Sequence, residues 1–178
     1  LREAIRVLET EGLITSLAYR GARVSDLSAV DLRDMLDVRI MLECFAARLA
    51  IERLDDAALQ TMEEQVNRAR AAGAQVGLEA NFELGLGFHD ILVAASGNRK
   101  VAQIHESLKR HQRRYQHFAF TRLGRDLRPL DEHADIVTAL RRRDQAAVED
   151  GLRTHFLRFY DEIAPLLPVD SAPDPDAR

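Results

Sequence analysis

Three histidines lie on the apolar faces of three segments with helical periodicity. His89 shares a face with Leu86 and Val93, and His133 and His155 have apolar neighbours about one turn away on their own segments. A single histidine in such a position is usually a hydrogen-bonded core residue. Three imidazoles that face one interior can instead bind zinc, nickel, copper or iron, and they leave coordination positions for water or an anionic ligand. The sequence therefore predicts a divalent metal site, most simply for zinc or nickel, formed by His89, His133 and His155.

A metal-dependent enzyme is the main alternative from another class of protein. Di-iron helical bundles use paired Glu-x-x-His motifs, whereas here leucine stands three residues before each histidine, at Leu86, Leu130 and Leu152. The sequence contains no phosphate-binding glycine loop, and Cys44 has no evident base near it on its apolar segment. We therefore expect a sensor of a small ligand and not an enzyme.

The elements that must position the histidines have helical periodicity from Ser28 onward. Ser28 with Asp31 is a capping signal for a helix of about 25 residues, and its expected buried face consists of Leu32, Met35, Leu36, Ile40, Leu42 and Phe45. Five more helices are predicted: from Asp55 or Asp56 to Ala71, from the turn at Gly73 and Gly77 to Ala95, from Lys100 to Phe120, from Leu130 to Arg142, and from Gln145 to Ala164. This pattern predicts an all-α antiparallel bundle of about six helices.

The first 26 residues differ from this body. Residues 1–12 predict a short basic helix that ends at Gly12, and the segment 19–24 is typical of a two-stranded ribbon because Gly21 lies between two arginines. A helix followed by a basic hairpin is the second half of a winged helix-turn-helix. We expect residues 1–26 to be a partial DNA-binding domain of an N-terminally truncated chain, residues 27–168 an effector-binding and dimerisation domain, and residues 169–178 a disordered tail.

Composition restricts the class of protein further. The formal net charge is −4, so any affinity for DNA must come from a local basic patch. The single cysteine, Cys44, forbids an intrachain disulfide, and no apolar run approaches the length of about 20 residues that crosses a bilayer. We therefore expect a cytoplasmic protein without a membrane span.

The N-terminal residues resemble a known DNA-binding family. Arg2-Glu3-Ala4-Ile5, Glu11-Gly12-Leu13-Ile14 and Arg20-Gly21-Ala22-Arg23-Val24 are similar to the recognition helix and wing of GntR-type bacterial transcription regulators. The resemblance implies DNA contacts by Arg2, Arg20, Gly21 and Arg23. Because the two helices that precede a recognition helix are not in this sequence, we expect the chain by itself to bind DNA weakly or without specificity.

A second resemblance covers about residues 27–166. It is carried by Arg39 with Glu43, Phe88-His89, Ala95-Ser96-Gly97-Asn98, Glu132-His133 with Ile136 and Ala139, and His155. These are similar to the FCD-type ligand-binding domain of the FadR subfamily of GntR regulators. The resemblance implies a homodimer that senses a small organic acid, through a divalent metal bound by an aspartate and three histidines. His133 and His155 keep the family spacing of about 22 residues, but Gly85 stands where the aspartate is expected.

Three alternatives stay open at this point. Arg39 is our candidate for the effector carboxylate, because a guanidinium can bind both oxygens, but an ion pair with Glu43 one turn later explains it equally well. Gly85 is also compatible with a metal-free pocket for a larger ligand, as in the acyl-CoA-binding members of the subfamily. His111 lies on a stripe with Ile104, Leu108, Tyr115 and Phe118, and we expect it to pack in the core.

Overall fold

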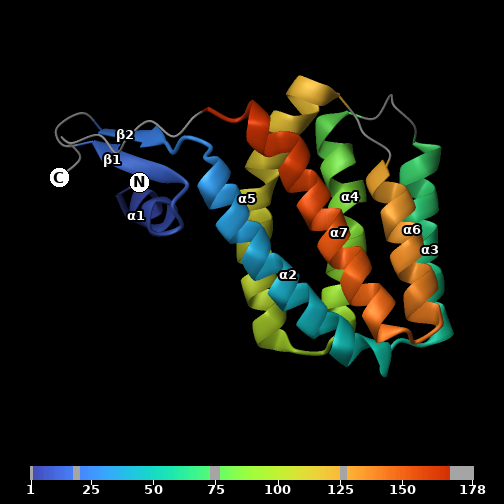
Figure 1. The fold of residues 1–178 in the computed structure, drawn as a ribbon. Coiled ribbons are helices and arrows are strands. Elements are labelled where there is room, and N and C mark those ends of the chain that lie inside the picture. The colour runs from blue at the N-terminus through green and yellow to red at the C-terminus, as the bar shows by residue number, and fades with distance from the viewer. Residues whose placement is uncertain (1, 18–20, 73–76, 125–127, 169–178) are drawn as a thin grey trace.

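Six long helices form the body of the protein (Figure 1). The computed structural model describes residues 2–17, 21–72, 77–124 and 128–168. Within these ranges the body consists of α2 (Ala29–Ile51), α3 (Asp56–Ala71), α4 (Leu78–Ala95), α5 (Arg99–Leu123), α6 (Arg128–Arg141) and α7 (Gln145–Ile163), which is followed by the short 3-10 helix η2 (Ala164–Leu166). The prediction of an all-α bundle of about six helices is confirmed.

Side-chain caps determine where several of these helices begin. The Ser28 hydroxyl accepts hydrogen bonds from the backbone N–H groups of Val30 and Asp31 at 3.1 and 3.3 Å. Asp55 and Asp144 cap α3 and α7 in the same way, through backbone N–H groups three residues later. These caps satisfy amide groups that have no partner inside the helix, and they confirm the starts predicted from the sequence.

The core lies between α2, α4, α6 and α7, with α3 and α5 packed at its sides. Phe45, which we expected on the buried face of α2, is 45% exposed, and Met41 beside it is 66% exposed. At 100° per residue, Phe45 lies on the opposite side of the helix from Leu36, which is fully buried. The prediction for Phe45 is therefore wrong, because α2 carries apolar residues around most of its circumference.

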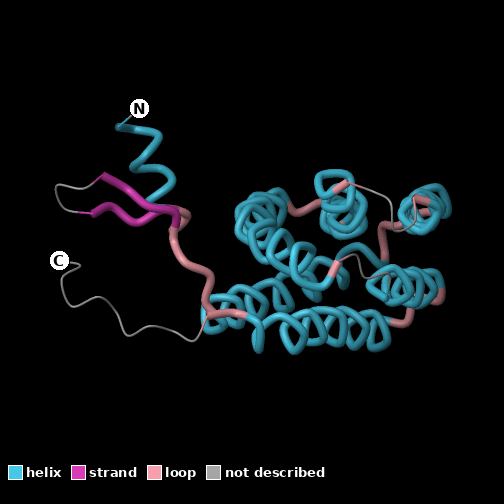
Figure 2. Tube along the Cα trace, turned by 90° about the horizontal axis from the view of Figure 1, so that it is seen from above, coloured by secondary structure: helices cyan, strands magenta, loops and turns pink. Residues whose placement is uncertain are grey.

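A small head lies to one side of the bundle (Figure 2). It consists of α1 (Arg2–Thr10) and an antiparallel ribbon of β1 (Ile14–Leu17) and β2 (Gly21–Val24), in which Ile14 is opposite Val24. Gly12 follows α1 with a φ of +70°, as its predicted role as helix terminator requires. The ribbon forms, but its first strand lies earlier than the segment from which we predicted it. Tyr19 and Arg20 of the expected turn, Gly73, and the tail at 169–178 lie outside the described residues.

Helix α5 makes the side-chain contacts between body and head. Arg110 Nη2 donates to Glu11 Oε1 at 2.6 Å, and Arg114 donates to the carbonyl oxygen of Ser25. The Tyr115 hydroxyl donates to the carbonyl oxygen of Ser28 at 3.1 Å. A displacement of α5 would therefore act directly on the residues that join the head to the bundle. None of the described helices is both long and apolar enough to cross a membrane.

Candidate metal centre and effector chamber

The three predicted histidines come together inside the bundle. His89 projects from α4, His133 from α6 and His155 from α7, and all three are buried. Their ring centroids are 4.6 to 5.2 Å apart, and one nitrogen of each lies within 4.8 Å of the others. The structure thus brings the whole predicted ligand set to one point.

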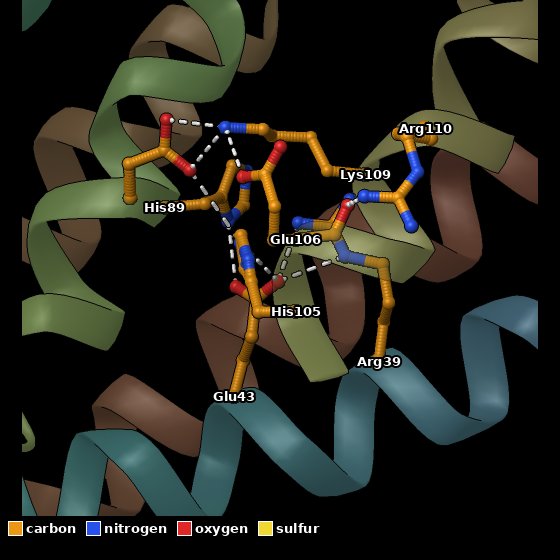
Figure 3. A network of polar contacts seen from close by, with 8 residues as sticks. Arg39, Glu43, His89, His105, Glu106, Lys109 and Arg110 are labelled. Carbon is orange, nitrogen blue, oxygen red and sulfur yellow. Dashed lines mark hydrogen bonds and ion pairs between the residues drawn. The ribbon is translucent and has the colours of Figure 1, made fainter. Parts of the chain in front are cut away.

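His89 is held by a buried ion pair on α2 (Figure 3). Its Nδ1 lies 2.6 Å from Glu43 Oε2, and Arg39 Nε donates to Glu43 Oε1 at 2.9 Å. Burial would raise the pKa of Glu43, but the charge of Arg39 and the hydrogen bond from His89 outweigh it and the pKa lies below its usual range. An ionised carboxylate only accepts hydrogen bonds, so Nδ1 of His89 must donate. The lone pair of Nε2 is then available to a metal, because burial lowers the pKa of His89 to about 4 and keeps the ring neutral.

His155 has an equivalent partner on α6. Its Nδ1 lies 2.7 Å from Glu132 Oε2, and Arg158 Nη2 donates to the same oxygen at 2.9 Å. Burial would raise the pKa of Glu132, but hydrogen bonds from His155 and Arg158 lower it to about 2. A carboxylate on the second nitrogen is the usual support of a metal-binding histidine, since it orients the ring and increases its basicity.

His133 differs from the other two because both of its nitrogens are buried without a hydrogen-bond partner among the described residues. Its ring stacks on Phe88 at a centroid distance of 4.3 Å. Burial and the neighbouring imidazoles lower its pKa well below the usual value. An unpaired buried polar group costs about 1–3 kcal/mol, and a bound metal would remove this penalty.

The site fits a divalent metal in donor type. In a tetrahedral zinc site, with zinc–nitrogen bonds of about 2.0–2.1 Å, two imidazole nitrogens are about 3.4 Å apart. The histidine nitrogens lie within 4.8 Å of one another, so the rings must approach by up to about 1.4 Å to bind one ion. At Gly85, one turn before His89, an added Cβ would meet no atom within 4 Å. The position of the expected aspartate is therefore open space.

A cavity of about 120 Å³ adjoins the histidines. It is lined by Gly85 from α4, by Gln112, Gln116, Phe120 and Leu123 from α5, and by Arg158, Phe159 and Ile163 from α7. We call this cavity the chamber. A small molecule in the chamber would touch the histidine nitrogens at one end and apolar side chains at the other.

Arg39 does not line the chamber. Its side chain is fully buried, its guanidinium lies 4.6 Å from the centre of the Phe156 ring, and its ion pair with Glu43 is present. Arg39 therefore forms the ion pair with Glu43 that was the alternative interpretation of the sequence. The pair is buried and not at the surface. The guanidinium among the lining residues of the chamber belongs to Arg158.

The predicted DNA-binding residues lie apart from the metal site, in the head. Arg2 is exposed on α1, and Gly21 and Arg23 are exposed on β2, where Arg23 Nη2 lies 3.3 Å from Asp26 Oδ2. Gly21 has a φ of +89°, which only glycine adopts readily. Arg20 lies outside the described residues.

Sequence reasoning missed several residues around the histidines. On α5 the buried stripe is formed by Val101, His105, Gln112 and Tyr115. Tyr115 belongs to the predicted stripe, but Ile104, its first member, is 48% exposed. His111 is half-buried beside the head and not in the core. His105 Nε2 lies 4.0 Å from Glu43 Oε1, the oxygen that also accepts the hydrogen bond from Arg39 (Figure 3). Val101, His105 and Gln112 are four and seven residues apart, and this helical spacing was the signal in the sequence that could have identified the buried face of α5.

Comparison with known proteins agrees with this architecture. Residues 34–158 match the model of the FCD domain. The HTH-type transcriptional repressor RspR of Escherichia coli is 28% identical over 163 residues, which are 92% of this chain and 72% of that protein. The HTH-type regulator YdhC of Bacillus subtilis is 29% identical over 162 residues, covering 88% of this chain and 70% of that protein.

Solved structures show the same fold. The E. coli protein McbR/YncC superposes with a TM-score of 0.83 at 17% identity, over 93% of this chain and 84% of that one. A GntR family transcriptional regulator from Pseudomonas syringae gives 0.70 at 24% identity, over 93% and 68%. The resemblance found in the sequence is confirmed, and it points to a regulator and not to an enzyme. The chain belongs to the FCD-domain family of transcription regulators.

Proposed function

We propose that this chain senses a small carboxylate-type metabolite through a divalent metal, zinc or nickel, held by His89, His133 and His155, and that it transmits binding to a DNA-binding head. The observation that carries the proposal is His133, whose two nitrogens are buried without a partner among the described residues. Such a group is rare in a folded protein unless a ligand completes it. His89 and His155 beside it already have the carboxylate partners that metal ligands use.

Each part of the site has a role in this proposal. When bound, the metal would supply the positive charge that attracts an acid into the chamber. Glu43 and Glu132 orient His89 and His155, and they keep the donating nitrogen of each ring turned away from the metal position. Arg39 holds Glu43 in place. Its Nη1 has no hydrogen-bond partner among the described residues, so a direct contact between Arg39 and the acid stays part of the proposal.

Transmission to DNA would pass through α5. This helix lines the chamber with Gln112 and Gln116, contacts the head through Arg110, and contacts the N-cap of α2, where the head joins the bundle, through Tyr115. If α5 has two positions and the acid binds the protein more tightly in one of them, binding would shift the population towards the placement of the head that goes with that position. We also propose that the protein is cytoplasmic and that the head contacts DNA through Arg2, Arg20, Gly21 and Arg23.

We include a homodimer in the proposal, because two heads are needed to read two half-sites. The outer face of α2 supports it. Val38, Met41 and Phe45 lie one turn apart on this face and are exposed, and together with Leu157 of α7 the last two line a groove. Exposed apolar side chains that cluster in this way mark interaction surfaces.

A metal-independent chamber for a larger ligand is the second candidate. The open space at Gly85 favours it, since a missing aspartate removes the charged ligand that relatives of this type are expected to use. In that case the three histidines would serve as polar lining, and His133 would bind the effector directly.

Elemental analysis of the untagged protein, before and after chelation and reloading, separates the two candidates. We expect close to one zinc or nickel ion per chain, lost in His133→Leu and retained in His111→Leu, which alters a half-buried histidine beside the head. A protein that binds no zinc, nickel, copper or iron after reloading would contradict the metal-dependent sensor.

A further inference from the structure

The wall of the chamber changes from polar to apolar along α5. Gln112 and Gln116 are followed on the same face by Ala119, Phe120 and Leu123. Leu123 lies eleven positions after Gln112, which is about 16 Å along the helix at 1.5 Å per residue. The chamber therefore has an inner end beside the histidines and an outer end whose lining is mainly apolar, with the carboxylate of Glu162 among it.

Helices α6 and α7 repeat this gradient in the same direction. On α7, His155 is followed one turn later by Phe159 and two turns later by Ile163, and on α6 Leu130 precedes His133 by one turn. The ion pair between Arg128 Nη2 and Glu162 Oε1, at 2.8 Å, brings the start of α6 level with the end of α7. The apolar residues of the three helices thus meet at the outer end.

The inner end carries unused hydrogen-bonding capacity. Gln112 Oε1 and Gln116 Oε1 are both buried and have no hydrogen-bond partner among the described residues. They lie one helical turn apart on the face that lines the chamber. A hydroxyl group both donates and accepts, so it can satisfy a side-chain amide in either orientation.

Among the described residues that line the chamber, no cation is left over for a second acidic group. Arg158 supplies the guanidinium among the lining residues, and it binds the carboxylates of Glu132 and Glu162. Burial would lower the pKa of Arg158, but these two partners raise it. A second carboxylate or a phosphate at the outer end would lose its water and face Phe120, Leu123 and Ile163, which is unfavourable for a charge.

We propose that the effector is a monocarboxylic 2-hydroxy acid with a short aliphatic tail. The inference rests on the proposed function, because the carboxylate would bind at the metal. Gln112 and Gln116 recognise the hydroxyl, and the tail lies along Phe120, Leu123 and Ile163. The volume of about 120 Å³ is near that of an engineered apolar cavity of about 150 Å³ that admits benzene, so the tail has about four carbons.

Calorimetric titration of the metal-loaded protein with lactate, 2-hydroxybutanoate and 2-hydroxyhexanoate tests the tail. We expect affinity to rise by about three- to fourfold per methylene, the usual gain for burying one. Hexanoate, which lacks the hydroxyl, should bind more weakly than 2-hydroxyhexanoate. Malate and citrate, whose additional carboxylates would meet the apolar end, should bind more weakly as well.

Variants of the two glutamines test the hydroxyl contact. In Gln112→Met and Gln116→Met, which keep side-chain length, the preference for 2-hydroxyhexanoate over hexanoate should fall about fivefold, as the loss of one hydrogen bond predicts. Gln103→Met is the matched control, because Gln103 is exposed on the same helix and does not line the chamber. The metal content of all three variants should equal that of the parent.

The outcomes separate this inference from the function on which it rests. If citrate or malate binds best, or if both glutamine variants keep the full hydroxyl preference, the assignment of the effector is overturned while the metal-dependent sensor stands. If the metal-loaded protein binds none of these acids, the proposed function fails together with the inference.

Discussion

Glu132 Oε2 lies 2.7 Å from His155 Nδ1 and accepts a second hydrogen bond from Arg158. The carboxylate therefore fixes one ring of the proposed metal site and is itself held in place by a cation. Glu43 does the same for His89, with Arg39 as its cation. Two of the three histidines are thus oriented before any metal binds, which is the usual design of a site that must bind an ion at low concentration.

The Glu132→Gln variant tests this support at the less buried of the two carboxylates. Removing the negative charge makes His155 a weaker ligand and frees its ring, so the metal affinity should fall by about 10- to 100-fold. Competition with a chromogenic chelator measures the change. Glu162→Gln is the control, since Glu162 also pairs with Arg158 but makes no hydrogen bond to the three histidines. An equal loss of metal affinity in both variants would show that the affinity depends on the ion pairs of Arg158 and not on the contact between Glu132 and His155.

The stability of the metal-free protein should depend on pH. Burial lowers the pKa of His89 from its usual 6.5 to about 4 and shifts that of His133 in the same direction. Between these values the unfolded chain binds more protons than the folded one, so the free energy of unfolding decreases as pH falls from about 6.5 towards 4. Above pH 7 both states carry neutral rings and this contribution is constant.

Urea unfolding of the chelated protein at pH 7.5, 6 and 5 measures this dependence. His133→Leu should have a shallower dependence, because it removes one of the two titrating rings. At pH 7.5 it should be about 1 kcal/mol more stable than the parent, since an unpaired buried imidazole is replaced by an apolar side chain. A parent protein whose stability is unchanged between pH 7.5 and 5 would contradict the assigned burial of these rings.

Gly85→Asp should strengthen metal binding. The structure has room for the new side chain one turn before His89, and a carboxylate there would complete a four-ligand set. We expect an affinity for zinc at least about tenfold above that of the parent. Gly85→Asn is the matched control, because it changes size and helix propensity similarly without the charge. If the two variants bind zinc equally, the open position is not adjacent to the ion.

Much of this fold follows from local signals in the sequence. Ser28, Asp55 and Asp144 cap their helices as predicted, because capping depends on residues within one turn. The three histidines were also found, since each lies on an apolar stripe of its own helix. The local sequence pattern therefore predicts which side chains face the interior, but not which residues they contact there.

The contacts that define the site were harder to predict. Glu43 and His89 are 46 residues apart and Glu132 and His155 are 23 apart, so their pairing depends on how the helices pack. The rotation of α5 was misjudged for a related reason. Apolar residues occur on more than one side of this helix, and a phase error of one position exchanged Ile104 for His105. Only the packing of α5 against α2 and α4 decides between the two faces.

Phe45 provides the last prediction, which concerns assembly. Its side chain and that of Met41 are exposed on α2 although both are large and apolar, and contact with a second copy would remove them from water. Phe45→Arg should therefore convert a dimer into a monomer, as measured by analytical ultracentrifugation, while thermal unfolding changes little because the site is at the surface. Val30→Arg is the control, since Val30 is also exposed but lies 15 residues away, about 22 Å along the helix. A Phe45→Arg protein that sediments like the parent and like the control would exclude this face of α2 as the dimer interface.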